Sequence, residues 1–293
     1  MLTAPWVGFY LSVALRGYPS LVHPVLFQFG SLIVPSYGAL AALGVLAGLL
    51  LVQRTARTVK VPAQHMWNLS VLSLFVALAG SRVLLVAVNW SLVRTHPDWL
   101  LGLAMVHHPL LAAMGAALAI AAAALYARWQ HMRWDAVADA AAPPLAFGLA
   151  FEQIGALLSG AGFGTPCSMP WAVTYIDPIA ERWSGVPMGI ALHPVQVYSA
   201  LAFFTIGFVL LIWLPQRQQR GEVAGVWLMA TGATIFFTEI WRDREGRGDF
   251  FGGILDGPQL ASIVLLLVGM VLLLKRNSAL IHAGTNAIEV AHE

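Results

Sequence analysis

The chain has very little charge and a single cysteine. Of its 293 residues, only 10% are Asp, Glu, Lys or Arg, whereas 59% are hydrophobic, and the mean hydropathy is +0.75. Cys167 stands alone, which excludes an intramolecular disulfide and any metal site built from several cysteines. So little charge in a chain of this length is typical of a protein embedded in a membrane.

The glycine-rich motifs that bind nucleotides are also missing. Neither GxxxxGK[ST] nor GxGxxG occurs, and no internal repeat of the transporter type is evident. Residues 1–15 lack the basic start and the cleavage site of a signal peptide, so we expect no cleaved leader. We expect no metal, no cofactor and no nucleic acid partner.

Seven long apolar runs are what the sequence does contain. A helix needs about 20 apolar residues to cross a hydrocarbon core of roughly 30 Å, and lipid offers no partner for unpaired backbone groups. We therefore predict an all-α polytopic membrane protein with seven transmembrane helices in a single domain over 1–276. A polar tail, disordered or peripheral, follows over 277–293. The predicted spans are 31–53, 67–90, 100–127, 135–162, 192–214, 223–241 and 255–275.

Basic residues in alternate loops predict the orientation. Nine of the sixteen Lys and Arg residues follow the first, third, fifth and seventh spans. They are Arg54, Arg57, Lys60, Arg128, Arg133, Arg217, Arg220, Lys275 and Arg276. Because loops rich in Lys and Arg stay in the cytoplasm, the N-terminus is expected outside and the C-terminus inside.

The longest outer loop, 163–191, is rich in aromatic residues. It contains Trp171, Tyr175 and Trp183. These side chains are consistent with a head that receives a peptide, with a surface for a partner subunit, or with anchors at the membrane interface. Cys167 lies in the same loop without a neighbour that would activate its thiol, and we expect it to be inert.

Several polar side chains fall within the predicted spans or at their outer ends. A charge at membrane depth costs several kcal/mol, so each such residue is a candidate site residue. They are Arg82, Glu152, Gln153, His193, Glu239 and Arg242. The predicted orientation places most of them in the outer half of the bundle, where they would form a partly cationic pocket. Arginine can hold a lipid phosphate there with two parallel hydrogen bonds.

These residues also have purely structural interpretations. Arg82 could extend to the outer headgroups, and His193 could cap its helix or bond a carbonyl group. Glu239 and Arg242 have the i, i+3 spacing of a local ion pair. Glu152 could pair with Arg82 or Arg242.

The fourth span carries further polar residues and two prolines. Asp135 and Asp139 lie near its cytoplasmic end, and we expect them to be solvated or to cap a helix. Pro143 and Pro144 should kink or break the helix. We expect this span to lie inside the bundle, because it is poorly suited to face lipid.

The order of several short motifs gives more specific information. The sequence has PSYG at 35–38, GSR at 80–82 and HPVQVY at 193–198, followed by Glu239 and Arg242. Over roughly residues 23–276, these segments resemble, in the same order, those of the prolipoprotein diacylglyceryl transferase family. The HPxQxY motif is the most specific of them.

The resemblance implies a reaction in the bacterial cytoplasmic membrane. The family transfers a diacylglyceryl group from phosphatidylglycerol to the thiol of a lipobox cysteine on a secreted precursor. Glycerol phosphate leaves and a thioether forms. We assign His193 and Glu239 to proton transfer or orientation. The candidate substrate-binding residues are Tyr37, Arg82, Glu152, Gln153, Gln196, Tyr198 and Arg242.

The chain departs from the family pattern at positions credited with the chemistry. Gln153 stands at the arginine of the family signature, Ala113 at a histidine of the third helix, and Ile235 at a further arginine. The other signature replacements are Ala156, Ser159 and Ala161. Glu152 or His108 could compensate for the lost groups.

Two interpretations of the activity therefore stay open. The chain is either a transferase with an altered site or a catalytically inactive relative. An inactive relative would bind lipid or form a structural subunit of a membrane complex, because binding and scaffolding need the fold but not the lost groups. A transporter is a weaker third alternative, since the membrane spans carry no ladder of ionisable residues.

Overall fold

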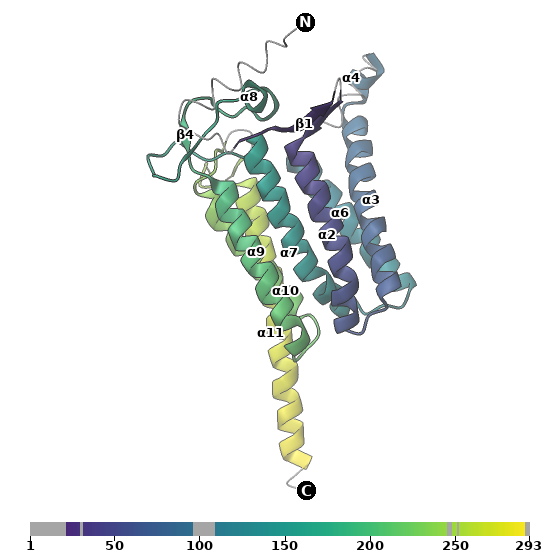
Figure 1. Cartoon of the computed structure of the whole chain (residues 1–293). Helices are drawn as coiled ribbons and strands as arrows, with labels where there is room; N and C mark the ends of the chain where they lie inside the picture. The colour runs from purple at the N-terminus through teal and green to yellow at the C-terminus, as the bar shows by residue number, and fades with distance from the viewer. Residues whose placement is uncertain (1–21, 30–31, 96–108, 245–247, 251, 291–293) are drawn as a thin grey trace, which may run out of the picture.

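The computed structural model describes residues 22–29, 32–95, 109–244, 248–250 and 252–290. It shows a bundle of long helices with a small cap at the end nearest the N-terminus (Figure 1). The long helices are α2 (Ser36–Thr58), α3 (Ala63–Val88), α6 (Pro109–Trp129), α7 (Trp134–Ser159), α9 (Val195–Trp213), α10 (Glu222–Glu239) and α11 (Gly257–Val290). The 3₁₀ turn η2 (Leu214–Gln216) continues α9.

In the described part of the chain, five helices are long and apolar enough to cross a membrane. They are α2, α3, α7, α9 with η2, and the Gly257–Leu274 part of α11. A polytopic, mostly helical membrane protein is therefore confirmed, whereas the full set of seven crossings and their orientation stay predictions. Helix α6 includes a shorter apolar stretch, Ala113–Trp129. The start of its predicted span, with His107 and His108, lies outside the described residues.

The first and last helices differ from their predicted spans. Residues 32–35, predicted to begin the first span, form strand β2 (Leu32–Pro35), which pairs with β1 (Val25–Phe29), and the helix starts only at Ser36. Pro35 precedes that helix in an extended conformation, with φ −67° and ψ 136°. At the other end, α11 continues to Val290 and so includes residues 277–290, which extend the helix beyond the bundle (Figure 1).

Helix α7 lies inside the bundle, as predicted, packed against α2, α9 and α10. Glycines allow its close approach to α2. A Cβ added at Gly44 would lie 2.8 Å from Phe151 Cβ, and one at Gly155 would lie 3.0 Å from the Tyr37 carbonyl oxygen. Small residues at such seams let two backbones pack closely in a membrane, where little hydrophobic force drives helices together.

The proline pair does not break α7, although a break was one of the two effects that we predicted for it. The helix runs without interruption through Pro143 and Pro144. Proline lacks an N–H group, so Pro144 cannot donate to the carbonyl oxygen of Ala140 four residues earlier. Thr55 of α2 donates its hydroxyl to that carbonyl at 2.7 Å. A neighbouring helix thus supplies the bond that the proline removes.

Asp139 is fully buried, so of the two roles expected for it, exposure to solvent or helix capping, the structure shows the second. It forms an ion pair with Arg217 and accepts hydrogen bonds from the backbone N–H groups of Gly221 and Ala224. It therefore caps the start of α10 from a different helix. Asp135 behaves as expected: it accepts from its neighbour's backbone at the start of α7 and pairs with the exposed Arg133.

Buried apolar side chains form two clusters at opposite ends of the molecule. The larger one includes Ala56, Met66, Val137 and Leu210, near the turns that join α2 to α3, α6 to α7 and α9 to α10. The smaller one, in the cap, comprises Val22, Tyr175, Ala180, Val186 and Leu192. Cap elements around it are β3 (Val173–Thr174), α8 (Pro178–Ser184) and β4 (Ala191–Leu192), with β3 paired to β4.

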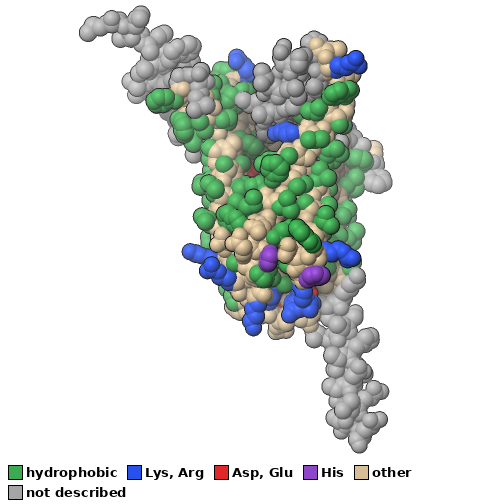
Figure 2. All heavy atoms as spheres, turned by 90° about the vertical axis from the view of Figure 1, so that its right-hand side faces the viewer, with side chains coloured by type: hydrophobic (Ala, Val, Ile, Leu, Met, Phe, Trp, Pro, Cys, Tyr) green, Lys and Arg blue, Asp and Glu red, His purple; other side chains and the backbone are tan. Residues whose placement is uncertain are grey.

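Two further cap strands, β5 (Asp249–Phe250) and β6 (Leu255–Asp256), form a hairpin before α11, and α4 (Trp90–Thr95) follows α3. On the outer surface, hydrophobic side chains cover the middle of the bundle. On the face that Figure 2 shows, most Lys, Arg and His side chains gather toward the end opposite the cap. This charge distribution agrees with the predicted orientation, in which that end faces the cytoplasm.

Candidate active site

Five polar side chains from three helix ends form a continuous row near the cap, which we call the polar row. The Tyr37 hydroxyl donates to Glu152 Oε1 at 3.0 Å, and the Gln153 amide donates to Glu152 Oε2 at 2.6 Å. Arg242 Nη2 donates to Gln153 Oε1 at 3.5 Å, and Arg242 Nε lies 3.0 Å from Glu239 Oε1. The amide of Gln153 therefore bridges a carboxylate on one side and a guanidinium on the other.

The packing of the helices brings this row together. Gly155 lets α7 approach α2 at Tyr37, whose hydroxyl then reaches Glu152 one turn away along α7. Arg242 follows the end of α10 and is paired with Glu239 across the i, i+3 spacing, as one structural interpretation predicted. Both partners are almost fully buried, with side-chain exposures of 10% for Arg242 and 5% for Glu239. In such surroundings their mutual attraction is weakly screened.

A second group of side chains, the cap cluster, lies on the outer side of the same region. The Trp171 indole donates to the Tyr198 hydroxyl oxygen at 2.8 Å, and His193 Nδ1 lies 3.4 Å from that oxygen. The Trp241 ring packs against both, with centroids 6.3 Å from those of His193 and Tyr198. His193 does not cap its helix, since Pro194 occupies the capping position. Its ring is held by aromatic neighbours instead.

An extended segment at 163–166 connects the polar row to the cap cluster. Gly164 forms a β-bridge with Arg242, and Pro166 forms one with Leu192. The His193 N–H donates to the Thr165 carbonyl at 3.0 Å, and the Thr165 N–H donates to the Trp241 carbonyl at 2.8 Å. Arg242 and His193 therefore lie on the two flanks of one strand-like segment.

Gly164 is required by this arrangement. A Cβ at this position would lie 2.3 Å from the His193 carbonyl oxygen and 2.8 Å from Val195 Cγ2. No flexible side-chain end can move aside, because the nearest atom is backbone. Glycine at position 164 thus has a steric reason.

Gln196 and Tyr175 donate hydrogen bonds to backbone carbonyl groups at and just beyond the end of α7. Gln196 is buried and donates its amide to the Ala161 carbonyl at 2.9 Å. The buried Tyr175 donates its hydroxyl to the Leu157 carbonyl at 3.1 Å, and burial raises the pKa of this phenol well above its ordinary value of 10.0. Tyr175 is therefore part of the cap core, whereas Trp171 and Trp183 are exposed.

Most of the predicted site residues thus lie in the polar row or in the cap cluster. Glu152 and Arg242 are linked through Gln153. Arg82 is half-buried on α3, a helix that packs against α6 and α2. Sequence reasoning missed Trp241. Its position next to Arg242, at the end of an apolar run, was the available signal.

Comparison with known proteins adds a family to this geometry. A family model described as prolipoprotein diacylglyceryl transferase matches residues 24–275. A phosphatidylglycerol–prolipoprotein diacylglyceryl transferase of Clostridium tetani is 26% identical over 252 residues, which is 85% of this chain and 96% of that protein. Its namesake in Thermosynechococcus vestitus is 29% identical over 248 residues, or 83% and 88% of the two chains. That of Vibrio cholerae is 27% identical over 264 residues, or 86% and 90%.

Proposed function

Because the chain belongs to the prolipoprotein diacylglyceryl transferase family, we propose that it transfers diacylglyceryl from phosphatidylglycerol to the lipobox cysteine of a lipoprotein precursor. The match covers residues 24–275, nearly all of the membrane-embedded chain. We further propose seven crossings of a bacterial cytoplasmic membrane, with the N-terminus and the cap outside. In that orientation the polar row and the cap cluster face the outer leaflet and the secreted precursor.

The reaction exchanges one bond for another at a glyceryl carbon. The thiol sulfur attacks the carbon that bears the phosphate ester, a C–S bond forms, and the C–O bond to the phosphate breaks. Glycerol phosphate leaves with the electron pair, and the thiol proton passes to a base. Thiolate is the reactive nucleophile, and the leaving phosphate gains charge as the bond breaks.

The described contacts suggest a division of roles. We assign Arg242 to the phosphate, because a guanidinium can bind two phosphate oxygens in parallel. Glu239 then orients Arg242 through their ion pair. We assign the thiol proton to Nε2 of His193, with the Nδ1 hydrogen shared with the Tyr198 oxygen. The single observation that carries the proposal is the placement of Arg242 and His193 on opposite flanks of the 163–166 segment.

One observation favours the inactive relative as a second candidate. Glu239 pairs with Arg242, and Gln153 connects that arginine to a second carboxylate, Glu152. A bound phosphate would bring further negative charge to this region. A lipid-binding or scaffolding protein could keep the polar row as a purely structural network.

A transfer assay separates the two candidates. The purified chain would be placed in phosphatidylglycerol nanodiscs with a lipobox peptide, and the diacylglyceryl adduct would be measured by mass spectrometry. We expect an adduct that is lost at least about 100-fold in Arg242→Gln, since one preorganised donor typically contributes 10²–10³ in rate. Arg133→Gln is the matched control, because it removes an exposed arginine at the opposite end of the bundle.

Two results would contradict the proposal. The first is no adduct from the wild-type chain while a family enzyme is active in the same nanodiscs. The second is an equal loss in Arg242→Gln and Arg133→Gln, which would reflect a general effect of charge. Folding of each variant would be checked by its thermal midpoint in detergent.

A further inference from the structure

A pocket at the end of the bundle opposite the cap takes no part in the proposed reaction. It has a volume of about 560 Å³ and is lined by residues of the turns that join α2 to α3, α6 to α7 and α9 to α10. The described lining includes Lys60, Arg133, Arg217 and Arg220 but neither Asp nor Glu. We call it the basic pocket. Such a lining favours an anionic ligand.

Two of the four cations are already engaged by carboxylates. Arg133 pairs with Asp135 at 2.8 Å, and Arg217 pairs with the buried Asp139. Within the described residues, the ion pairs include neither Lys60 nor Arg220. Arg220 lies near enough to Asp135 to interact with that carboxylate, but neither it nor Lys60 is held in one of these ion pairs, and these two cations are the ones we assign to the ligand.

The backbone at two positions in the pocket is unusual. Among the described residues, Lys60 and His131 are the only non-glycine residues with positive φ, at 61° and 51°, and both line the basic pocket. Each follows a helix end in a Schellman motif. The Val61 N–H donates to the Ala56 carbonyl at 2.9 Å, and the Met132 N–H donates to the Ala127 carbonyl at 2.8 Å.

Glycine is the usual residue at this position of the motif, because it adopts the left-handed conformation without steric cost. A lysine and a histidine stand there instead, in two separate turns that face one pocket. Strained backbone that persists in this way is concentrated at functional sites. The two turns thus point independently to a role for their side chains.

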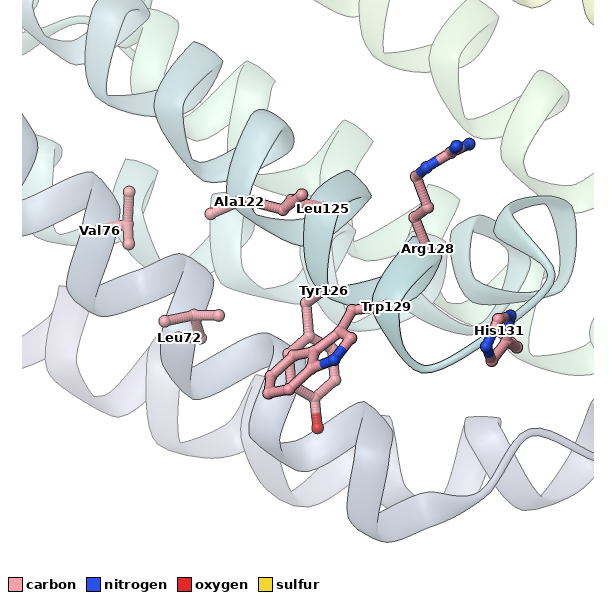
Figure 3. Close-up of a pocket in the computed structure, with 8 residues that line it drawn as sticks. All are labelled: Leu72, Val76, Ala122, Leu125, Tyr126, Arg128, Trp129 and His131. Carbon is pink, nitrogen blue, oxygen red and sulfur yellow. The ribbon is translucent and has the colours of Figure 1, made fainter.

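An apolar groove of about 750 Å³ opens directly beside the basic pocket. Leu72 and Val76 of α3 and Ala122 and Leu125 of α6 line it, as Figure 3 shows, and Trp129 lies toward its end. The groove is therefore shaped by two helices that both face the hydrocarbon region.

The groove and the basic pocket adjoin each other. His131 lines both of them. Tyr126 of the groove and His65 of the pocket are also in contact, with the hydroxyl oxygen 3.2 Å from His65 Nδ1. The apolar groove thus meets the basic pocket at the level where headgroups of the predicted cytoplasmic leaflet would lie.

We propose that the basic pocket and the apolar groove together bind one phospholipid with an anionic headgroup. The headgroup phosphate contacts Lys60 and Arg220, and an acyl chain lies in the groove between α3 and α6. Juxtamembrane cations attract anionic lipids, and basic pockets between helices on the cytoplasmic side bind such headgroups. This site is separate from the candidate active site and lies at the other end of the bundle.

Lipid titration monitored by native mass spectrometry tests the proposal. Phosphatidic acid and phosphatidylcholine with the same acyl chains would be titrated into the full chain in detergent. We expect phosphatidic acid to bind more tightly, and Lys60→Gly/Arg220→Gln to weaken its binding about 10- to 30-fold, since each surface cation contributes roughly a fivefold effect. Glycine suits the left-handed position of Lys60, so this variant should fold.

Matched variants identify where the lipid binds. Arg54→Gln/Arg57→Gln removes two exposed cations from the same end of α2, outside the pocket lining, and should leave the preference intact. Ala122→Phe fills the groove and should weaken phosphatidic acid binding. Arg242→Gln should leave it unchanged, which separates this site from lipid bound at the candidate active site.

Several outcomes would overturn the proposal. Equal binding of the two lipids would indicate annular lipid only. An equal loss in both double variants would indicate general surface charge. Competition by millimolar inorganic phosphate would indicate a soluble-anion site, and an unchanged affinity in Ala122→Phe would exclude the groove.

Discussion

Removing the carboxylate of Asp139 should destabilise the protein far more than removing that of Asp135, one helical turn away on α7. Asp139 is fully buried, pairs with Arg217 and accepts two backbone N–H groups at the start of α10. Taking one partner from a buried ion pair typically costs 3–5 kcal/mol, because the other charge is left unpaired. The Arg133–Asp135 pair is exposed, and such pairs contribute little to stability because water and salt screen them.

The magnitude for Asp139→Ala can be divided into its causes. Losing the cap on α10 accounts for about 1 kcal/mol, since capping residues typically contribute 0.5–2 kcal/mol. The larger part comes from Arg217, whose side chain is only 13% exposed and would be stranded. Asp139→Asn should lie between wild type and Asp139→Ala, because it keeps an acceptor for Ala224 but loses the charge.

The assay is unfolding of the full chain in mild detergent, by thermal midpoint and by denaturant. Asp135→Ala is the control and should shift the midpoint little. The double variant Asp139→Ala/Arg217→Met should recover much of the loss, because it removes the stranded charge together with its partner. Equal shifts for Asp139→Ala and Asp135→Ala, or a double variant no more stable than Asp139→Ala, would refute the reasoning.

Three further changes test the candidate site and the cap. Gln153→Arg restores the charge at the family's arginine position and should raise transfer about 10-fold or more in the adduct assay; an unchanged rate would mean that this charge does not limit the reaction. Gly164→Ala places a Cβ 2.3 Å from the His193 carbonyl oxygen and should lower the thermal midpoint and abolish transfer, whereas Gly148→Ala, with open space around its Cβ position, should be tolerated. Burial raises the pKa of Tyr175, so the neutral phenol stabilises the cap below pH 10, and this contribution is lost as the pH rises further. In alkaline unfolding between pH 10 and 12, Tyr175→Phe should therefore lose less stability than wild type.

The polar row and the cap cluster show how local sequence signals combine with tertiary packing. The Glu239–Arg242 pair was predictable from the sequence, because i, i+3 neighbours meet on any helix. The link from Tyr37 to Glu152 was not, since it spans 115 residues and depends on the close approach that Gly155 permits. The contact of His193 with Trp241 likewise depends on tertiary structure, because the 163–166 segment lies between His193 and Trp241 and bonds to the backbone of both.

The sequence by itself determined that the chain is a helical membrane protein of this family. Apolar runs long enough to span a bilayer, alternating with basic loops, can be identified from the order of residues alone. They predict helices because lipid allows few backbone structures. The HPVQVY motif at 193–198 and its neighbours identified the family for the same reason, as local strings. Neither depends on which helix packs against which.

Only the tertiary structure decided which polar groups are partners. Asp139 caps a helix other than its own, and the carbonyl freed by Pro144 accepts a hydrogen bond from Thr55 of α2. These contacts join residues 85 positions apart in the chain. Their formation depends on the distance and angle between packed helices, which hydrophobic periodicity does not encode. For the same reason, the sequence could not show that Lys60 and His131 line one pocket. Their two separate turns face the same pocket only after the bundle has assembled.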